Sequence, residues 1–167
     1  MGQLRHRIHE NFSEERLEAI EDITRNPSFK NNNERCDAIL DVVKDMSVKF
    51  LGPGTNRMAF LYDEYVYKVA MDSFGIRDNW TEFNMSKELQ PYVTKTYECN
   101  GLIAVAEYVN LFTMEEFTRS KEVIIGILED LSHDYLFCDI SASTKSFANW
   151  GYRSNHDIVI LDFGLTK

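Results

Sequence analysis

Apolar residues recur with two different periods along the chain, and the change of period separates an amino-terminal part from the rest. In this first part they recur every three to four positions, which predicts amphipathic helices. One helix is expected from its cap, Ser13, to about Arg25, ended by Pro27. A second is expected from the Asn31-Asn32-Asn33 segment to Met46. We expect the two helices to form an accessory layer.

From Val48 onward the period falls to about two, which is the spacing of β-strands. Asp63-Glu64 predicts a tight turn, and Asn100-Gly101 predicts a type I′ hairpin turn because both residues tolerate positive φ. A helix is expected from about Ile76 to Leu89, before Pro91. The strands are expected over residues 48–51, 58–62, 65–70, 94–98 and 102–109.

The last part of the chain combines a helix with short strands. The segment Thr113-Met114-Glu115-Glu116 matches a capping box, which predicts a helix that breaks near Ser120 and continues to about Leu131. Short strands are expected over residues 135–138, 148–153 and 157–161. No internal repeat or long linker separates these elements, so a single domain or two small lobes is expected.

Composition limits the partners and the compartment. The 27 acidic residues outnumber the 18 Lys and Arg residues and give a net charge of −9, so we expect no nucleic acid and no membrane surface as a partner. Cys36, Cys99 and Cys138 are widely separated, which supports neither a disulfide framework nor a zinc site. Without a secretory or membrane-spanning segment, a soluble cytoplasmic protein is expected.

Candidate chemistry begins in the loop between the first two strands. Gly52 and Gly54 would let a backbone approach a phosphate closely. Lys68 lies in the middle of the strand 65–70, where alternation places it on one defined face. Its simpler interpretation is an edge lysine whose ammonium reaches solvent. A buried Lys68 needs a carboxylate partner, for which Glu82 is the first choice and Glu88 the competing one.

Three further polar residues follow apolar segments near the end of the chain. Asp139 follows the strand 135–138, Asn149 begins the next strand, and Asp162 ends the run from Ile158 to Leu161. An ionised carboxylate at the end of a buried strand needs a cation or hydrogen-bond donors. Two oxygen ligands together with phosphate oxygens suit Mg²⁺, which keeps several of its waters.

This chain resembles the protein-kinase signature set from about Phe50 to Lys167. The signature elements occur in the same order: a glycine loop, a strand lysine, a helix glutamate, Asp139, Asn149 and Asp162-Phe163-Gly164. The loop resembles that of small kinase-like proteins of bacteria and phages. The resemblance implies an α+β fold with a five-stranded antiparallel amino-terminal lobe, one main helix and a reduced helical carboxy-terminal lobe. It implies three parts: a helical extension (1–47), an amino-terminal lobe with hinge (48–109) and a reduced lobe (110–167).

The resemblance also implies a role for each matched residue. Lys68 would hold the α- and β-phosphates of ATP, with Glu82 as its ion-pair partner, and Asp139 would orient or deprotonate the acceptor hydroxyl. Mg²⁺ would be held by Asn149 and Asp162. The remaining nucleotide contacts implied are the loop residues Gly52, Gly54, Thr55, Asn56 and Arg57 and the hinge residues Ala106, Glu107 and Val109.

Some departures from the family pattern affect these roles. The third glycine of the loop is replaced by Arg57, which either contacts phosphate or is a solvated hairpin arginine. Asp139 follows Phe137-Cys138 where the family has His-Arg, so control by a phosphorylated activation loop is not expected. Asp139 also lies ten positions before Asn149, farther than in the family, and Asp134 is a rival base. Only three residues follow Gly164, so a shortened second lobe is expected.

These observations leave several functional hypotheses. The first is ATP- and Mg²⁺-dependent phosphoryl transfer to protein serine or threonine, including autophosphorylation, in the cytoplasm of a bacterial host if the chain is phage-encoded. The alternative is a pseudokinase that engages a partner protein without turnover, and a third hypothesis is transfer to a small molecule. A shortened lobe would leave the helix from residue 114 to 131 uncovered, which predicts a homodimer or a partner protein over Val123, Ile124, Ile127 and Leu128.

Overall fold

The computed structural model describes residues 6–134, 136–137, 140–162 and 165–166, within a chain that divides into two compact units. Unit 1 comprises Met1–Phe83 and Thr96–Tyr108, and unit 2 comprises Asn84–Lys95 and Val109–Lys167. Each unit has its own apolar core. The described part of the chain therefore has two separate packing centres, and the predicted division into 1–47, 48–109 and 110–167 stays a prediction.

Unit 1 contains a five-stranded antiparallel sheet with the strand order β1-β2-β3-β5-β4. Its strands are β1 (Lys49–Pro53), β2 (Arg57–Tyr62), β3 (Tyr65–Ala70), β4 (Thr96–Cys99) and β5 (Ile103–Glu107). The central strand β3 pairs with β2 and β5, so its backbone hydrogen bonds are formed on both edges. The sheet predicted from the period of two is confirmed.

Of the two predicted tight turns of the sheet, the first is confirmed and the second differs from expectation in its geometry. Asp63 and Glu64 have φ values of +46° and +67°, and positive φ at both central residues is the mark of a type I′ turn. In the second hairpin Asn100 and Ile103 are joined by a backbone hydrogen bond, which makes Gly101 and Leu102 the central residues. Only Gly101 has a positive φ, +90°, so the type I′ prediction for this hairpin is wrong and the turn is closer to type II′.

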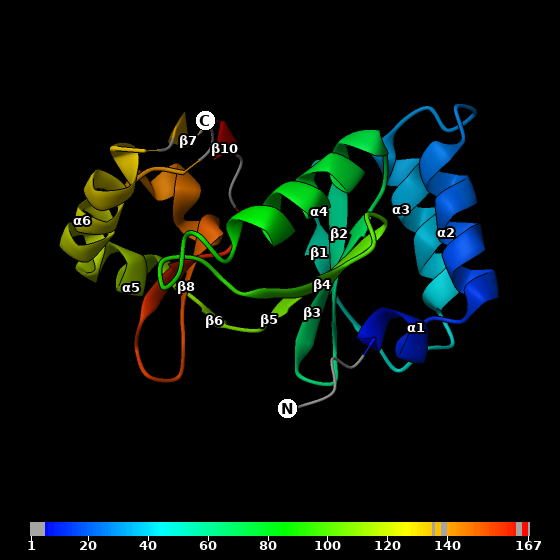
Figure 1. Cartoon of the computed structure of the whole chain (residues 1–167), viewed down its shortest axis with the longest axis horizontal. Helices are drawn as coiled ribbons and strands as arrows, with labels where there is room; N and C mark the ends of the chain where they lie inside the picture. Colours follow the sequence, from blue (N-terminus) through cyan, green and yellow to red (C-terminus); the bar gives the residue numbers. More distant parts are fainter. Residues whose placement is uncertain (1–5, 135, 138–139, 163–164, 167) are drawn as a thin grey trace. The chain divides into compact units, whose positions relative to one another are not determined.

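Helices cover both faces of this sheet (Figure 1). The first three helices, α1 (Arg7–Asn11), α2 (Glu14–Arg25) and α3 (Asn32–Val43), pack on one face, where they share a core with alternate residues of the central strands. The opposite face carries α4 (Ser73–Met85). Side chains alternate along a strand, so the residues between the core positions point toward α4. The sheet residues of the core are Met58, Phe60, Tyr67, Val69, Ile103 and Val105.

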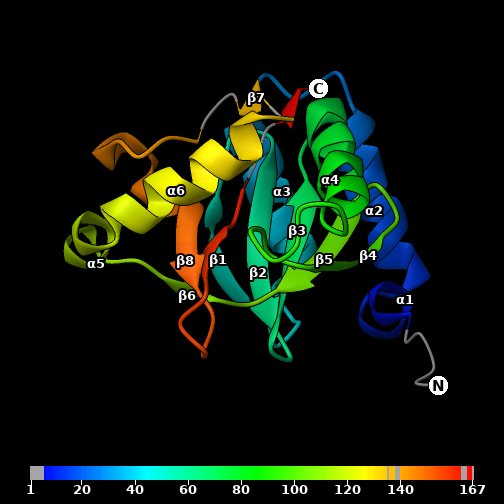
Figure 2. The ribbon, with the colours of Figure 1, turned by 60° about the vertical axis from the view of Figure 1, so that its left-hand side comes forward.

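Unit 2 is built from two short helices and small sheets (Figure 2). The helix α5 (Met114–Arg119) is followed by α6 (Lys121–Ser132), with the predicted break at Ser120 and both hydrogen bonds of the predicted capping box. Between the helices and the last strands lies the 3₁₀ segment η1 (Thr144–Asn149). The strands are β6 (Asn110–Leu111), β8 (Trp150–Tyr152) and β9 (Ile158–Ile160) in one sheet and the pair β7 (Leu136–Phe137) and β10 (Leu165–Thr166).

The apolar face of α6 is largely covered within its own unit. Ile124 is fully buried and Ile127 is 8% exposed, and Leu128 packs against the same core. Val123 is 56% exposed. The expectation that all four residues need an external cover is therefore wrong for Ile124 and Ile127, and the predicted homodimer or partner protein stays a prediction.

The predicted fold class is confirmed: the described residues form an α+β structure with a five-stranded antiparallel sheet and one main helix after the third strand. Among the helices in the described part of the chain, none is both long enough and apolar enough to cross a membrane.

Candidate functional site

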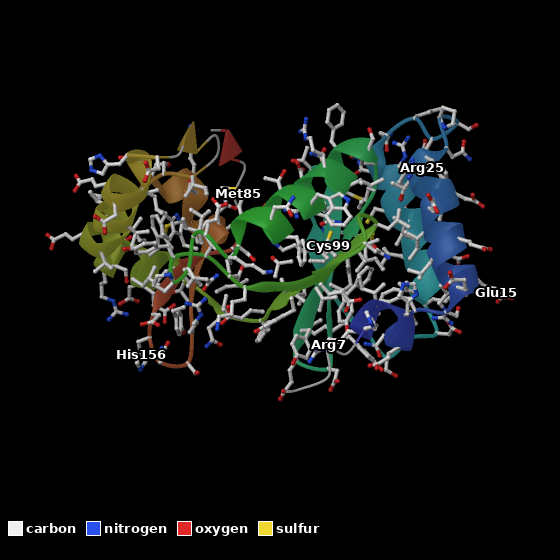
Figure 3. All side chains as sticks on the ribbon, viewed as in Figure 1. Arg7, Glu15, Arg25, Met85, Cys99 and His156 are labelled. Carbon is white, nitrogen blue, oxygen red and sulfur yellow. The ribbon has the colours of Figure 1, made fainter. Side chains whose placement is uncertain are left out.

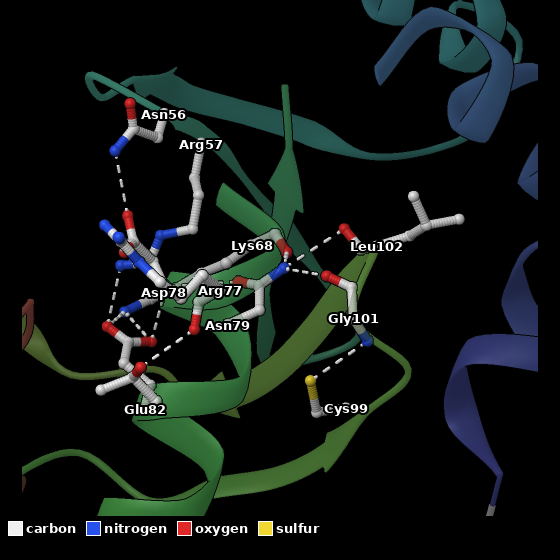
Figure 4. Close-up of polar contacts among 11 residues, drawn as sticks. Asn56, Arg57, Lys68, Arg77, Asp78, Asn79, Glu82, Cys99, Gly101 and Leu102 are labelled. Atoms are coloured by element: carbon white, nitrogen blue, oxygen red, sulfur yellow. Dashed lines mark hydrogen bonds and ion pairs between the residues drawn. The ribbon is translucent and has the colours of Figure 1, made fainter. Parts of the chain in front are cut away.

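A buried ion pair joins the central strand of unit 1 to α4. Lys68 lies on the face of β3 that points toward α4, and its Nζ is 2.7 Å and 2.8 Å from the two carboxylate oxygens of Glu82 (Figure 4). The side chains are 14% and 2% exposed. Lys68 is thus neither on an edge strand nor solvent-exposed. Of the two candidate acids Glu82 makes this contact, whereas Glu88 is an exposed residue after the end of α4.

Arg57 is a second cation on the same carboxylate, which sequence reasoning did not foresee. Its Nη2 is 3.0 Å from Oε1 of Glu82 and its Nη1 is 3.0 Å from Oε2. The side chain is only 10% exposed, so the interpretation of Arg57 as a solvated hairpin arginine is wrong. Because Arg57 begins β2 and pairs with Ala70 at the end of β3, the sheet register directs it to the α4 face.

Asn79 orients this cluster and was also missed. Its Oδ1 accepts a hydrogen bond of 3.2 Å from Arg57 Nη1, and its Nδ2 donates to the carbonyl of Gly101 at 2.9 Å. Asn79 is fully buried and precedes Glu82 by three positions, which places both on one face of α4. That spacing of two polar residues in a buried helix face was the available sequence signal.

The electrostatics of the cluster follow from its burial. Burial alone would raise the pKa of Glu82, but the charges of Arg57 and Lys68 and their hydrogen bonds outweigh it and lower the pKa to about 2. Glu82 is therefore ionised at neutral pH, and two cations and one anion give the three side chains a formal charge of +1 together.

The glycine loop is held in place by backbone and side-chain contacts. Gly52 has a φ of +143°, a conformation that favours glycine, and the Gly54 N–H donates to the carbonyl of Arg57 at 2.6 Å. Asn56 bonds to α4 through its Nδ2 and Asp78 Oδ2, 3.1 Å apart. Its carbonyl accepts a hydrogen bond of 2.9 Å from Met71 N. The loop that would lie over a nucleotide is thus tied to the start of α4.

The helix α3 also contacts this loop. The side-chain Nδ2 of Asn32, in α3, donates to the carbonyl of Thr55 at 2.8 Å and to Asp72 Oδ2 at 2.7 Å. Asp72 in turn accepts a hydrogen bond from Gly75 N in the first turn of α4. The helix α3 therefore contacts the glycine loop directly. The sequence placed Asn32 in a cap segment and gave no other signal for this contact.

The proposed hinge spans the end of β5 and the start of unit 2. Ala106 is buried in β5, opposite Val66 in β3, and Glu107 is the last residue of β5. Val109 is buried within unit 2. The order of these residues along the chain is the expected one, and their contacts to adenine stay a prediction.

Unit 2 brings two of the three downstream candidates together. The Asn149 carbonyl accepts a hydrogen bond of 2.8 Å from the N–H of Leu161, the residue before Asp162. Pairing of β8 with β9 produces this proximity, because Trp150 lies opposite Ile160. Asn149 ends the 3₁₀ segment, so the expectation that it begins a strand is off by one residue.

The remaining catalytic candidate is Asp139, which lies outside the described residues, as do Phe163 and Gly164. Its rival, Asp134, is exposed just after α6. No group of three or more His, Cys, Asp and Glu side chains suited to a metal is found among the residues with described positions. A pair of oxygen ligands such as Asn149 and Asp162 is the kind of site that Mg²⁺ shares with phosphate oxygens.

Comparisons with known proteins found distant structural similarity. A scan against protein-family models and a search of curated proteins found no match. Among solved structures, a gentamicin complex of APH(2")-IIa is 16% identical, with a TM-score of 0.46 over 80% of this chain and 71% of that one. Rv3197 from Mycobacterium tuberculosis, in complex with erythromycin, is 12% identical, with a TM-score of 0.42 over 99% and 60%. Choline kinase LicA from Streptococcus pneumoniae is 12% identical, with a TM-score of 0.38 over 79% and 70%.

At such identities and with TM-scores all below 0.5, these solved structures carry no argument about this chain. The function of this chain is therefore inferred from its own side chains.

Proposed function

We propose that this chain is an ATP- and Mg²⁺-dependent phosphotransferase. The observation that carries the proposal is the buried ion pair between Lys68 in the central strand and Glu82 in α4. Taking both charges out of water is costly, and a hydrophobic pair would often be at least as stable. A lysine ammonium fixed at the surface of a sheet beside a glycine loop is, in contrast, a suitable point charge for a polyphosphate.

In this proposal the candidate residues have different roles. Lys68 binds the α- and β-phosphates, the backbone of the loop from Gly52 to Arg57 lies along them, and the hinge residues receive the adenine. Asn149 and Asp162 hold Mg²⁺, which offsets the negative charge that develops on the transferred phosphoryl group. Asp139 accepts the proton of the acceptor hydroxyl.

The acceptor is proposed to be a hydroxyl group, with protein serine or threonine as the first class to test. The segment between Asp139 and Asn149 carries several hydroxyls: Ser141 Oγ lies 2.8 Å from Ser143 Oγ and 3.0 Å from Ser146 Oγ. Ser143 is exposed. These positions support autophosphorylation as a measurable first reaction, and a small-molecule hydroxyl is the alternative acceptor.

Thermal unfolding with and without Mg·ATP tests the nucleotide site. Ligand at about 100 times its Kd stabilises a protein by about 2.7 kcal/mol, which gives a clear rise in Tm. The rise should be absent in Lys68→Ala, and in Asp162→Ala it should no longer depend on Mg²⁺. An unchanged Tm in the parent protein would contradict the proposal.

Transfer of labelled γ-phosphate then tests turnover. We expect label on the protein itself, located by mass spectrometry, and its loss in Asp139→Asn. Binding of Mg·ATP without any transfer to protein or to added small alcohols would instead assign the chain as a pseudokinase. Label that persists in Asp139→Asn would show that another residue is the base.

A further inference from the structure

Asn32, the first residue of α3, joins this helix to two segments of unit 1 that lie far from it in the sequence. Its Nδ2 donates to the carbonyl of Thr55 at 2.8 Å and to Asp72 Oδ2 at 2.7 Å. Its Oδ1 accepts a hydrogen bond of 3.1 Å from Arg35 Nη1. A carbonyl and a carboxylate are both acceptors, so only the NH₂ group of the amide can bond to the two together. The contacts therefore fix the orientation of the Asn32 amide.

The contact with Thr55 orients a whole peptide group of the glycine loop. The carbonyl of Thr55 and the N–H of Asn56 belong to one planar trans peptide, in which the two groups point in opposite directions. Since the carbonyl points toward Asn32 in α3, the N–H of Asn56 points away from α3. In the described part of the chain this N–H has no hydrogen-bond acceptor. It is a donor whose direction is set by a helix outside the loop.

The other polar groups of Asn56 are held by the segment that contains α4 (Figure 4). Its Nδ2 donates to Asp78 Oδ2 at 3.1 Å, and its carbonyl accepts a hydrogen bond from Met71 N at 2.9 Å. Asn56 is thus fixed through its side chain, its own carbonyl and the carbonyl that precedes it. An anion that bonds to its N–H therefore binds to a donor that is already in place.

The direction of this N–H agrees with the position of Lys68. The helices α3 and α4 pack on opposite faces of the sheet (Figure 1). An N–H that points away from α3 is directed to the side that carries α4 and the ammonium of Lys68. A backbone N–H in a glycine-containing loop and a lysine ammonium are complementary donors for a polyphosphate.

We infer that Asn32 is a positioning residue: through the Thr55 carbonyl it aims the N–H of Asn56 at the phosphates of a bound nucleotide. The inference rests on the proposed nucleotide-binding function. It adds that the amino-terminal helices, beyond covering the sheet, take part in phosphate binding through α3. Because Asn32 acts on the loop alone, its loss weakens the binding of phosphates and leaves the binding of the adenine and ribose unchanged.

The test compares Mg·ATP with adenosine, which has no phosphate, in calorimetric titrations of the full chain. Asn32→Asp keeps the size of the side chain but replaces the NH₂ donor with an oxygen that repels the Thr55 carbonyl and the Asp72 carboxylate. The Kd for Mg·ATP should rise by about tenfold, which corresponds to about 1.4 kcal/mol, and the Kd for adenosine should not change. Asn32→Ala removes the donor without adding charge and serves as the test if Asn32→Asp does not fold.

The amide signal of Asn56 in ¹H–¹⁵N nuclear magnetic resonance spectra gives a readout that does not depend on adenosine. In the parent, addition of Mg·ATP should shift this signal, because the N–H gains a phosphate acceptor. In the variant of Asn32 the shift should be much smaller at the same saturation with nucleotide. A general loss of stability would not produce this difference.

Two controls test whether any change in this helical layer has the same effect. Asn33→Asp makes the same substitution at the next position of α3, where the side chain is exposed. Arg25→Gln removes an exposed ion pair with Glu21 on α2 (Figure 3). Both variants should bind Mg·ATP with the Kd of the parent. The fold of each variant is checked by circular dichroism.

An exchange of side chains separates the two contacts of the Asn32 amide. In Asn32→Asp/Asp72→Asn the amide at position 72 can donate to the carboxylate at position 32, so the link from α3 to the start of α4 is kept. The net charge is also that of the parent. The Thr55 carbonyl still lacks its donor, so the Kd for Mg·ATP should stay raised.

Each outcome has a separate meaning. An unchanged Kd for Mg·ATP in Asn32→Asp, or in Asn32→Ala where only that variant folds, overturns the inference. An equal rise for Mg·ATP and adenosine also overturns it and would assign Asn32 to the stability of the fold alone. Recovery of the affinity in the exchange variant would show that the contact with Asp72 is sufficient. Absence of Mg·ATP binding in the parent would instead remove the proposed function, on which the inference depends.

Discussion

Units 1 and 2 bring their candidate residues together by different means. In unit 1, Arg57, Lys68 and Glu82 are buried and bonded to one another through their side chains. In unit 2, the Asn149 carbonyl accepts a hydrogen bond from the backbone N–H of Leu161, the residue before Asp162, which brings Asn149 and Asp162 close together. Asp162 itself is exposed. The candidate residues of unit 1 are therefore part of its core structure, whereas exposed Asp162 in unit 2 is not.

This difference predicts that substitutions affect stability very unequally. Glu82→Ala leaves two buried cations without their carboxylate and should lower the free energy of unfolding by about 3–5 kcal/mol. Asp162→Ala removes an exposed carboxylate and should change it by no more than about 0.5 kcal/mol in the absence of ligand. Urea unfolding of both variants is the measurement. Equal losses would show that the two units do not differ in this respect.

The same difference should appear in the dependence of stability on pH. The folded-state pKa of Glu82, about 2, lies below its ordinary value of 4.5, so Glu82 stabilises the fold above pH 4.5 and this contribution is lost as the pH falls toward 2. The shift corresponds to roughly 3 kcal/mol, at about 1.4 kcal/mol per pKa unit.

Urea unfolding across this pH range measures the effect as the difference between the parent and Glu82→Gln. The matched acid in unit 2 is half-buried Glu116, whose pKa is lowered by the hydrogen bond from the backbone N–H of Thr113. Glu116→Gln should reduce the pH dependence much less. A parent and a Glu82→Gln variant that lose stability in parallel would contradict the prediction.

Replacing a glycine with alanine should change the stability of the protein in opposite directions in the two units. A Cβ on Gly75 would overlap the carbonyl oxygen of Asn56 and lie 3.0 Å from the Cα of Ala70, so the glycine loop or α4 would have to shift. We expect Gly75→Ala to destabilise the protein by about 1–3 kcal/mol and to weaken nucleotide binding. Gly126, in α6, has nothing within 4 Å of a built Cβ.

Gly126→Ala should therefore stabilise the protein by about 0.5–1 kcal/mol, because alanine is the better helix former. Thermal unfolding of the two variants and a Mg·ATP titration of Gly75→Ala are the measurements. Tolerance of alanine at position 75 would show that the loop and α4 are not in close contact.

A modest effect is expected at the start of α5, where the capping box forms. Thr113 Oγ1 accepts from Glu116 N at 3.2 Å, and Glu116 Oε2 accepts from Thr113 N at 2.8 Å. Thr113→Ala should cost about 1 kcal/mol. Thr118→Ala, on the same helix, is the control and should be neutral or slightly stabilising, since within the described part of the chain that hydroxyl donates to the carbonyl of Met114 one turn earlier. Equal effects would exclude the cap as the cause.

Features that depend on neighbouring residues could be predicted from the sequence. The capping box at Thr113, the helix break at Ser120 and the strand β3 each follow from a local pattern, and the structure contains all three. The contact of Lys68 with Glu82 also followed from local patterns, because the strand fixes the face of one and the helix the face of the other.

Features that depend on how strands are paired could not be predicted in this way. The partner of Arg57 is decided by the register of β2 on β3, and a shift of one residue would turn it to the opposite face. The predicted type of the turn after β4 was wrong. The Asn100 side chain accepts a hydrogen bond from Ile103 N, and the central residues of the turn are Gly101 and Leu102 instead of Asn100 and Gly101. The contact of Asn32 with the glycine loop joins segments 23 residues apart.

The layer formed by α1, α2 and α3 has a practical consequence for anyone who shortens this chain. A chain that begins at Val48 keeps the whole sheet and Lys68, yet it uncovers the apolar sheet face that includes Met58, Phe60 and Val69. A contiguous apolar surface of that kind promotes self-association in water. Such a fragment should therefore precipitate during purification, and its loss of nucleotide binding could not be assigned to the missing Asn32 alone.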